Sequence, residues 1–171
     1  MPNLILEKTN SITRIVLNRP PLNIINLALM KELSDALDAA RDAKIIVIAA
    51  QGKFFCAGVD IGEHRPETVD AMIRGFHAVI KKIWAMEQPV VAAVQGSALG
   101  GGMELALACD FIIASQAAQF GQPEIKVGVY PPIAALMLSR LIPRKKAFEL
   151  ILTGDSIDAR TAAQLGLVNA V

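Results

Sequence analysis

The sequence predicts an α/β fold in which strands alternate with helices and pair largely in parallel. Short all-apolar runs, typical of strands covered on both faces, occur at 45–50 and 90–94. Each run is followed by a glycine-containing loop and then by a stretch in which apolar residues recur at helical spacing. This alternation favours helices layered on a parallel sheet, with ligands gathered at the strand ends.

Length and composition indicate one compact domain. A chain of 171 residues fits a single domain over 1–171, and 53% hydrophobic residues can supply its core. Seventeen Lys and Arg against sixteen Asp and Glu leave a net charge of +1, which argues against nucleic acid or an anionic membrane as a partner. No apolar run approaches the roughly 20 residues of a membrane span, and no secretion signal is recognisable. With only two cysteines, we expect a soluble, cytoplasmic protein.

The first part of the chain is predicted to form a hairpin, a helix and a buried strand. Residues 4–8 and 11–17 are rich in apolar and β-branched residues on either side of a polar turn, which predicts the hairpin. Prolines at 20–21 end this pattern because proline cannot donate to a strand ladder. Asn26 can cap a helix that follows, with apolar residues along one side. The strand at 45–50 comes next.

The rest of the chain continues the alternation. A loop over 51–62 follows the first buried strand, and a glycine-rich loop over 96–102 follows the second. The remaining elements are predicted to be a helix over 68–86, a strand over 90–94, a helix over 103–108, a strand over 111–115, and helices near 133–141, 144–152 and 158–164.

The glycine-rich loop is the first candidate site. Three glycines, Gly100 to Gly102, precede a helix and allow a ligand to approach the amides at its start, where negative charge is favoured. A phosphate loop would need Lys-Ser or Lys-Thr where Gly102-Met103 stands, and a dinucleotide fingerprint would need a small residue in place of Leu105. An enolate oxyanion would suit the site, although close packing of helix on sheet would explain the same glycines.

Two glutamates are candidate acid–base residues. Glu104 lies in the predicted helix among non-ionisable neighbours, so desolvation is expected to raise its pKa. The simpler interpretation is a solvated carboxylate that complements the helix dipole. Glu124 lies on a turn and could divide acid and base roles with Glu104, although their spacing does not show that they meet.

Other reactive side chains give weaker signals. His64 and His77 lack partners at metal-ligand spacing, so no metal site is expected, and His77 is interpreted as a helix-surface or packing residue. Ser97 lacks the pattern of a nucleophile elbow. Cys109 is interpreted as a small buried hydrophobe.

Several segments together resemble the crotonase (enoyl-CoA hydratase/isomerase) superfamily. They are 17–20 with Asn23, 55–61, 94–105, 120–125 and the tail 152–168. The resemblance covers essentially the whole chain, and the motifs are highly specific in combination. It implies a crotonase-like spiral of ββα units, an acyl-CoA thioester as substrate, and no cofactor or metal beyond that substrate.

The resemblance also implies residue roles. The backbone amides of Val59 and Gly101 would form an oxyanion hole for the thioester carbonyl. Glu104 and Glu124 would activate water for attack at the β-carbon and supply the α-proton. The other substrate-binding positions, near the adenine and pantetheine of coenzyme A, would be Ala57, Asp60, Ile61 and Gly62. Because both glutamates are retained, hydration is favoured, which makes the protein a lyase of acyl-CoA metabolism in fatty acid or aromatic degradation.

Two departures from the family pattern refine these expectations. The stretch 129–135, with 63–67, is similar to the branch that hydrates cyclohexa-1,5-diene-1-carbonyl-CoA. Family members also usually continue beyond the position of Val171 into a helical region that covers the site and supports trimers, so we expect a core that lacks most of this region. A homo-oligomer, trimer or hexamer, is still expected. An isomerase, an acyl-CoA hydrolase, and an inactive acyl-CoA-binding or assembly module remain as alternatives.

Overall fold

Two β-sheets with helices packed around them make up the structure, a computed structural model that describes residues 2–171. The strands are β1 (Leu4–Lys8), β2 (Ile12–Leu17), β3 (Ile45–Ala50), β4 (Phe54–Cys56), β5 (Val90–Val94), β6 (Ser97–Leu99), β7 (Phe111–Ala114), β8 (Gln119–Gly121) and β9 (Ser156–Asp158). The helices are α1 (Leu27–Ala39), α2 (Val69–Trp84), α3 (Gly101–Leu107), α4 (Pro132–Leu141), α5 (Arg144–Thr153) and α6 (Ala159–Gln164), with the 3-10 turns η1 (Ile61–Glu63) and η2 (Pro123–Val127).

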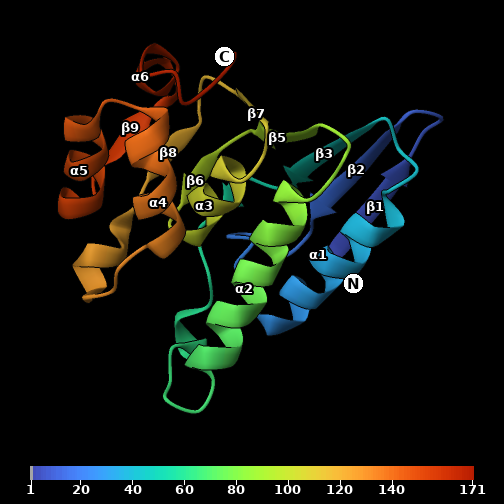
Figure 1. Ribbon diagram of the computed structural model, residues 1–171, viewed down its shortest axis with the longest axis horizontal. Coiled ribbons are helices and arrows are strands. Elements are labelled where there is room, and N and C mark those ends of the chain that lie inside the picture. The colour runs from blue at the N-terminus through green and yellow to red at the C-terminus, as the bar shows by residue number, and fades with distance from the viewer. Residues whose placement is uncertain (1) are drawn as a thin grey trace.

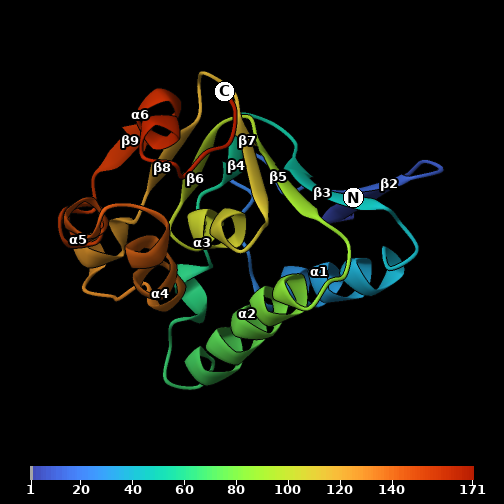
Figure 2. The same ribbon diagram turned by 45° about the horizontal axis from the view of Figure 1, so that its top comes forward.

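The larger sheet has the strand order β1-β2-β3-β5-β7, and α1 and α2 lie along one of its faces (Figures 1 and 2). The hairpin β1–β2 is antiparallel and the other neighbours pair in parallel, as the sequence predicts. Ile46 and Ile48 of β3 are fully buried in the core shared with these helices, whereas Ile45 is 37% exposed. The prediction that β3 is covered on both faces is therefore confirmed only in part: both helices pack on the same side, and on the other face Ala49 is buried, at 6% exposure.

The first two helices form where the sequence predicts them. The Asn26 side chain accepts a hydrogen bond from the Leu29 amide (3.0 Å) and so caps α1. Apolar residues at helical spacing place one side of α1 and one side of α2 in the core, and the two helices pack against each other. Together they cover one face of the larger sheet.

The smaller sheet was not predicted. It has the order β4-β6-β8-β9, in which the first three strands are parallel and β9 is antiparallel to β8. Each of its strands is three residues long, too short to show an alternating pattern, and β4 and β6 lie within segments that the sequence predicts as loops. These strands form because each one pairs with a strand from another part of the sequence.

The two sheets arise from a repeated ββα unit. The units are β3-β4-α2, β5-β6-α3 and β7-β8-α4, and in each one the first strand joins the larger sheet and the second joins the smaller sheet. Successive units stack in parallel, so the chain winds as a spiral. The spiral of ββα units implied by the resemblance is thereby confirmed.

Helix α3 lies at the centre of the molecule (Figure 2). All seven of its residues are buried, and it packs against β4, β6 and α4. It begins at Gly101, two residues before the predicted start, so two of the three glycines belong to the helix itself. Within residues 2–171, no helix has both the length and the apolar character needed to cross a membrane.

Candidate active site

The backbone at Val59 is oriented by a short parallel pairing with Ile25. The Ile25 amide donates to the Gly58 carbonyl (2.9 Å), and the Ile25 carbonyl accepts from the Asp60 amide (2.9 Å). In a parallel bridge of this kind, one residue bonds to both neighbours of the residue opposite it. The amide of Val59 itself therefore points away from Ile25.

Gly101 lies close to the backbone of Val59. A Cβ atom added to Gly101 would lie 3.2 Å from the Val59 nitrogen, so the two backbones are in close contact. Gly101 is also the first residue of α3, where amides have no partner within the helix. Neither amide donates to an acceptor within residues 2–171. The amides of Val59 and Gly101 are thus two free hydrogen-bond donors that lie close together.

Glu104 projects from the first turn of α3 and is only 4% exposed. Its Oε1 accepts a hydrogen bond from the Ala134 amide at the start of α4 (2.8 Å). The pKa of this carboxyl is raised from 4.5 to about 7, mainly by burial, which the hydrogen bond from the Ala134 amide opposes and the charge of Glu124 reinforces. The predicted upward shift is confirmed, and its main cause is desolvation.

Glu124 lies in η2 and is half-buried, and burial raises its pKa as well. The fully buried Gln122, with its amide turned to donate, places its nitrogen 3.2 and 3.0 Å from the two Glu124 oxygens. Gly100 has a φ of +53°, and a Cβ atom there would lie 2.6 Å from Glu124 Oε1. The backbone conformation favours glycine at this position, and any larger residue would also displace the Glu124 carboxylate.

Glu104 and Glu124 line one cavity of about 500 Å³, and Val59 lines it as well. The structure therefore brings together two carboxylates that are 20 residues apart in the sequence. The rest of the wall is largely apolar. It comprises side chains from one side of α2, the loop between η2 and α4, and His64.

His77 belongs to this wall, which the sequence analysis did not anticipate. It lies on α2 one turn after Ile73 and next to Phe76, both of which also line the cavity. Partial burial lowers its pKa, and Lys81 lowers it further. The helical spacing of 69, 73, 76 and 77 was available in the sequence, but only the position of α2 beside α3 shows which stripe faces the site.

The other predicted binding positions lie beside the cavity rather than in its wall. Ala57 donates its amide to the Leu22 carbonyl (2.9 Å), and the Asp60 carboxylate caps η1 by accepting from the Gly62 amide (2.8 Å). Ile61, in the same turn, is 71% exposed. None of them is among the residues lining the cavity, so the structure groups them on the adjoining surface.

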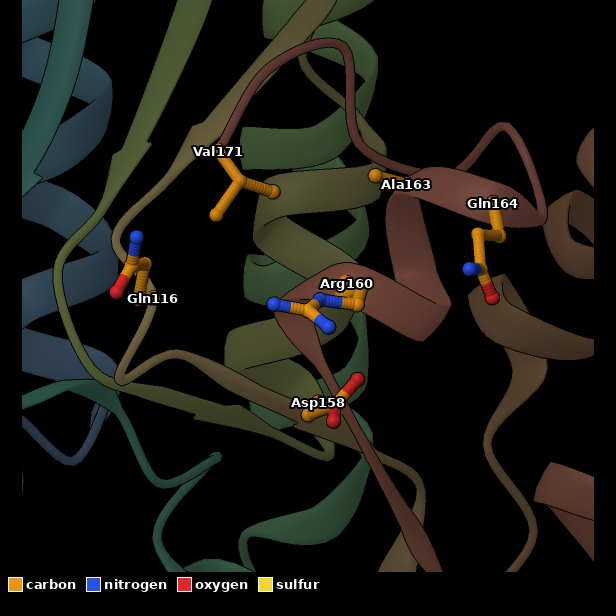
Figure 3. Close-up of a pocket in the computed structure, with 6 residues that line it drawn as sticks. All are labelled: Gln116, Asp158, Arg160, Ala163, Gln164 and Val171. Carbon is orange, nitrogen blue, oxygen red and sulfur yellow. The ribbon is translucent and has the colours of Figure 1, made fainter.

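A second cavity, of about 630 Å³, shares no lining residue with the first (Figure 3). It is lined by Gln116, Asp158, Arg160, Ala163, Gln164 and Val171. Asp158 is already engaged as the cap of α6, since it accepts from the Thr161 amide (2.7 Å). This cavity contains no residue that the sequence analysis selected.

The thiols give no nucleophile. Cys56 and Cys109 are both buried, and burial raises the pKa of Cys56 to about 12 and that of Cys109 still further. Within residues 2–171, no three His, Cys, Asp or Glu side chains are grouped in a way that could hold a metal ion.

A buried and a half-buried carboxyl group thus line one cavity close to two backbone amides without partners, on an α/β spiral. Groups of this kind are suited to acid–base chemistry next to an oxyanion. The family model for enoyl-CoA hydratase/isomerase matches residues 7–171. The chain belongs to this family of enzymes.

Individual relatives agree with this assignment. A "Probable enoyl-CoA hydratase" of Rhizobium meliloti is 45% identical over 174 residues, which cover 98% of this chain and 68% of the relative. The "Crotonyl-CoA hydratase" of Syntrophomonas wolfei is 41% identical over 180 residues, covering 99% and 68%. The "Cyclohexa-1,5-dienecarbonyl-CoA hydratase" of Thauera aromatica is 31% identical over 169 residues, covering 97% and 66%.

Solved structures share the fold over the same extent. The enoyl-CoA hydratase of Mycobacterium smegmatis superposes with a TM-score of 0.95 at 33% identity, covering 100% of this chain and 70% of that one. The chain thus spans about two thirds of the length of its relatives.

Proposed function

We propose that this chain adds water reversibly to the α,β double bond of an enoyl-CoA thioester. The observation that carries the proposal is the placement of Glu104 and Glu124 on one cavity, next to the free amides of Val59 and Gly101. The hydratase names of relatives at 41–45% identity support the same reaction.

The two amides would stabilise the charge that develops on the thioester oxygen. When the oxygen of water bonds to the β-carbon, the electrons of the double bond move toward the carbonyl, which becomes an enolate oxyanion. Donors held in place before the reaction need no reorganisation, and one such donor is worth about 10²–10³ in rate. This role is supported by the pairing of Ile25 with the neighbours of Val59 and by the position of Gly101 at the start of α3, which fix the backbone around both amides.

The two carboxyl groups would move the protons. As water attacks, one of the pair accepts a proton from it, and the other delivers a proton to the α-carbon, so that one water is added in total. A pKa of about 7 for Glu104 suits such work near neutral pH, because the group can be found in either protonation state. The two groups interact, so their titration belongs to the pair.

The surface beside the cavity would hold coenzyme A. We assign this role to Ala57, Asp60, Ile61 and Gly62, which follow β4 and flank Val59. The thioester would then reach the amides of Val59 and Gly101, and the acyl group would enter the cavity. No cofactor other than the coenzyme A of the substrate takes part.

Two acyl groups are candidates. The higher identity to a crotonyl-CoA hydratase favours a short linear enoyl group. The loop Tyr130-Pro131-Pro132 in the cavity wall favours a compact cyclic dienoyl group, because consecutive prolines make that wall stiff.

Product analysis tests the proposal. The purified chain is incubated with crotonyl-CoA and separately with cyclohexa-1,5-diene-1-carbonyl-CoA, and the products are identified by mass. A gain of one water is expected, and the faster substrate identifies the acyl group. A new chromatographic peak with the mass of the substrate would indicate an isomerase, and free coenzyme A would indicate a hydrolase. Bound thioester without any product would indicate an inactive binding or assembly module.

Matched substitutions test the carboxylates. Glu104→Gln and Glu124→Gln are each expected to lower kcat by at least about 10² while the fold is retained. Glu149→Gln serves as the control, because Glu149 lies on α5 in an exposed ion pair with Lys146. Full activity in either cavity variant would contradict the proposed roles.

A further inference from the structure

Asn23 has a backbone conformation and an environment unusual for asparagine. Its φ is +52°, and among residues 2–171 it is the one non-glycine residue with a positive φ. It is also fully buried, at 0% exposure. A polar residue in this situation persists only when its surroundings satisfy it and hold it in place.

The Asn23 side chain links three segments of the chain. Its Oδ1 accepts from the Arg19 amide (2.9 Å), which closes the turn in which Asn23 lies. Its Nδ2 donates to the carbonyls of Gln51 (2.9 Å) and Phe54 (2.8 Å). Both carbonyls belong to the stretch that leads from β3 into β4. The side chain therefore joins the turn before α1 to the start of β4.

The residues on either side of Asn23 continue this connection toward the oxyanion hole. The Leu22 carbonyl accepts from the Ala57 amide (2.9 Å), and Ile25 bonds to both neighbours of Val59. Farther along, the Glu63 carboxylate accepts from the Leu27 amide (2.9 Å) at the start of α1. Residues 22–27 thus run beside residues 57–63 and are hydrogen-bonded to them, and the Asn23 side chain fixes the first part of this segment.

We propose that Asn23 is a positioning residue that sets the direction of the Val59 amide. Without the two bonds that its amide donates, residues 22–25 could shift along 57–60, and the Val59 N–H would no longer be held beside Gly101. This inference rests on the proposed function, because it assigns a role within the proposed oxyanion hole. Asn23 itself does not touch the substrate.

The variant Asn23→Gly tests this role. Glycine keeps the left-handed backbone and removes the three side-chain bonds. The Phe54 carbonyl keeps a second donor, Gln95 Nε2 (3.1 Å), and Gln51 is an exposed residue, so the variant is expected to fold. Asn169→Ala is the matched control, because the Asn169 side chain also accepts a backbone amide, that of Ile112 (2.8 Å), at β7. Should Asn23→Gly not fold, Asn23→Asp replaces it: aspartate keeps the bond from the Arg19 amide, and when ionised it loses the two donated bonds and turns a carboxylate oxygen toward the Gln51 and Phe54 carbonyls.

The readout is the absorption spectrum of a bound electron-rich cinnamoyl-CoA thioester. Hydrogen bonds to its carbonyl shift the maximum to longer wavelength, because the excited state places negative charge on that oxygen. We expect a clear red shift with the unchanged chain and with Asn169→Ala, and at most half of it with the Asn23 variant. For crotonyl-CoA, kcat should fall roughly tenfold to a hundredfold while KM changes much less.

The outcomes separate the two proposals. If the unchanged chain gives no red shift, both the oxyanion hole and the role of Asn23 are overturned. If the unchanged chain and the Asn23 variant give the same red shift, only the role of Asn23 is overturned. Melting temperature alone would not decide, since both Asn23→Gly and Asn169→Ala lose hydrogen bonds and are expected to be less stable.

Discussion

Glu104 shows how burial of one carboxyl group couples chemistry to stability. Its pKa is about 7 in the folded protein, against an ordinary value of 4.5. Between these two values the folded state binds more protons than the unfolded state, so the free energy of unfolding falls as pH rises. The loss is complete above the folded pKa and amounts to roughly 3 kcal/mol at most.

This coupling predicts a pH-dependent difference between the unchanged chain and Glu104→Gln. A neutral amide can still accept from the Ala134 amide but has no charge to bury, so the variant should be the more stable protein at pH 8. The advantage should shrink as pH falls through 7 and be smallest below about pH 4.5. Chemical unfolding at several pH values measures it.

Two comparisons sharpen the result. Glu124→Gln should show the same sign with a smaller change, because Glu124 is only half-buried. The exposed Glu149→Gln should show almost none. A difference between Glu104→Gln and the unchanged chain that does not vary with pH would contradict the assignment.

At the scale of elements, the position of α3 depends on close contact with β4. A Cβ atom on Gly102 would lie 2.2 Å from the Cys56 carbonyl oxygen, which is backbone and cannot rotate away. The closeness of these elements brings Gly101 to Val59. From the sequence, the same glycines were equally consistent with close packing and with an anion site. In the structure Gly102 allows the close packing, and the proposed oxyanion hole uses the amide of Gly101.

The substitution Gly102→Ala is therefore predicted to be severe. The added methyl group must push α3 away from β4, which should cost about 3 kcal/mol or more in stability. Gly166→Ala is the control, because Gly166 has a φ of +80° but no atom within 4 Å of an added Cβ. Its cost should be about 1 kcal/mol, from backbone strain alone. Urea unfolding measures both, and equal losses would argue against the close contact.

At the scale of the whole molecule, exposed apolar side chains gather on η2 and α5, which pack against each other. Val127 is 60% exposed and Leu152 is 65% exposed, and Phe148 of α5 is 44% exposed. In Figure 1 this side, with α4 and α5, lies across the molecule from α1 and β1. Scattered apolar residues are ordinary on a surface, but a group on adjoining elements favours association.

We therefore predict a homo-oligomer, and the resemblance to the family implies a trimer or a hexamer. Sedimentation equilibrium should give a mass three or six times that of the 18.3 kDa chain. Leu152→Ser with Val127→Ser should lower this mass. Phe111→Ser, at an exposed position on β7, is the control and should leave it unchanged. A single-chain mass for the unchanged protein at micromolar concentration would contradict the prediction.

The pattern of residues along the chain was sufficient to predict the longer helices and strands. The hairpin, α1, α2 and the strands of the larger sheet follow from the spacing of apolar residues and from the Asn26 cap, which act between near neighbours in the chain. The buried environment of Glu104 was also predictable, because the residues around it in α3 are non-ionisable.

The sequence by itself determined the alternation of elements, the family to which the motifs point, and the chemistry of the candidate residues. Only the tertiary structure decided that Glu104 and Glu124 share a cavity, that β4 and β6 are strands, and that His77 faces the site. The orientation of the Val59 amide was likewise decided by its pairing with Ile25. Each of these depends on contacts between residues far apart in the chain, which no local spacing encodes.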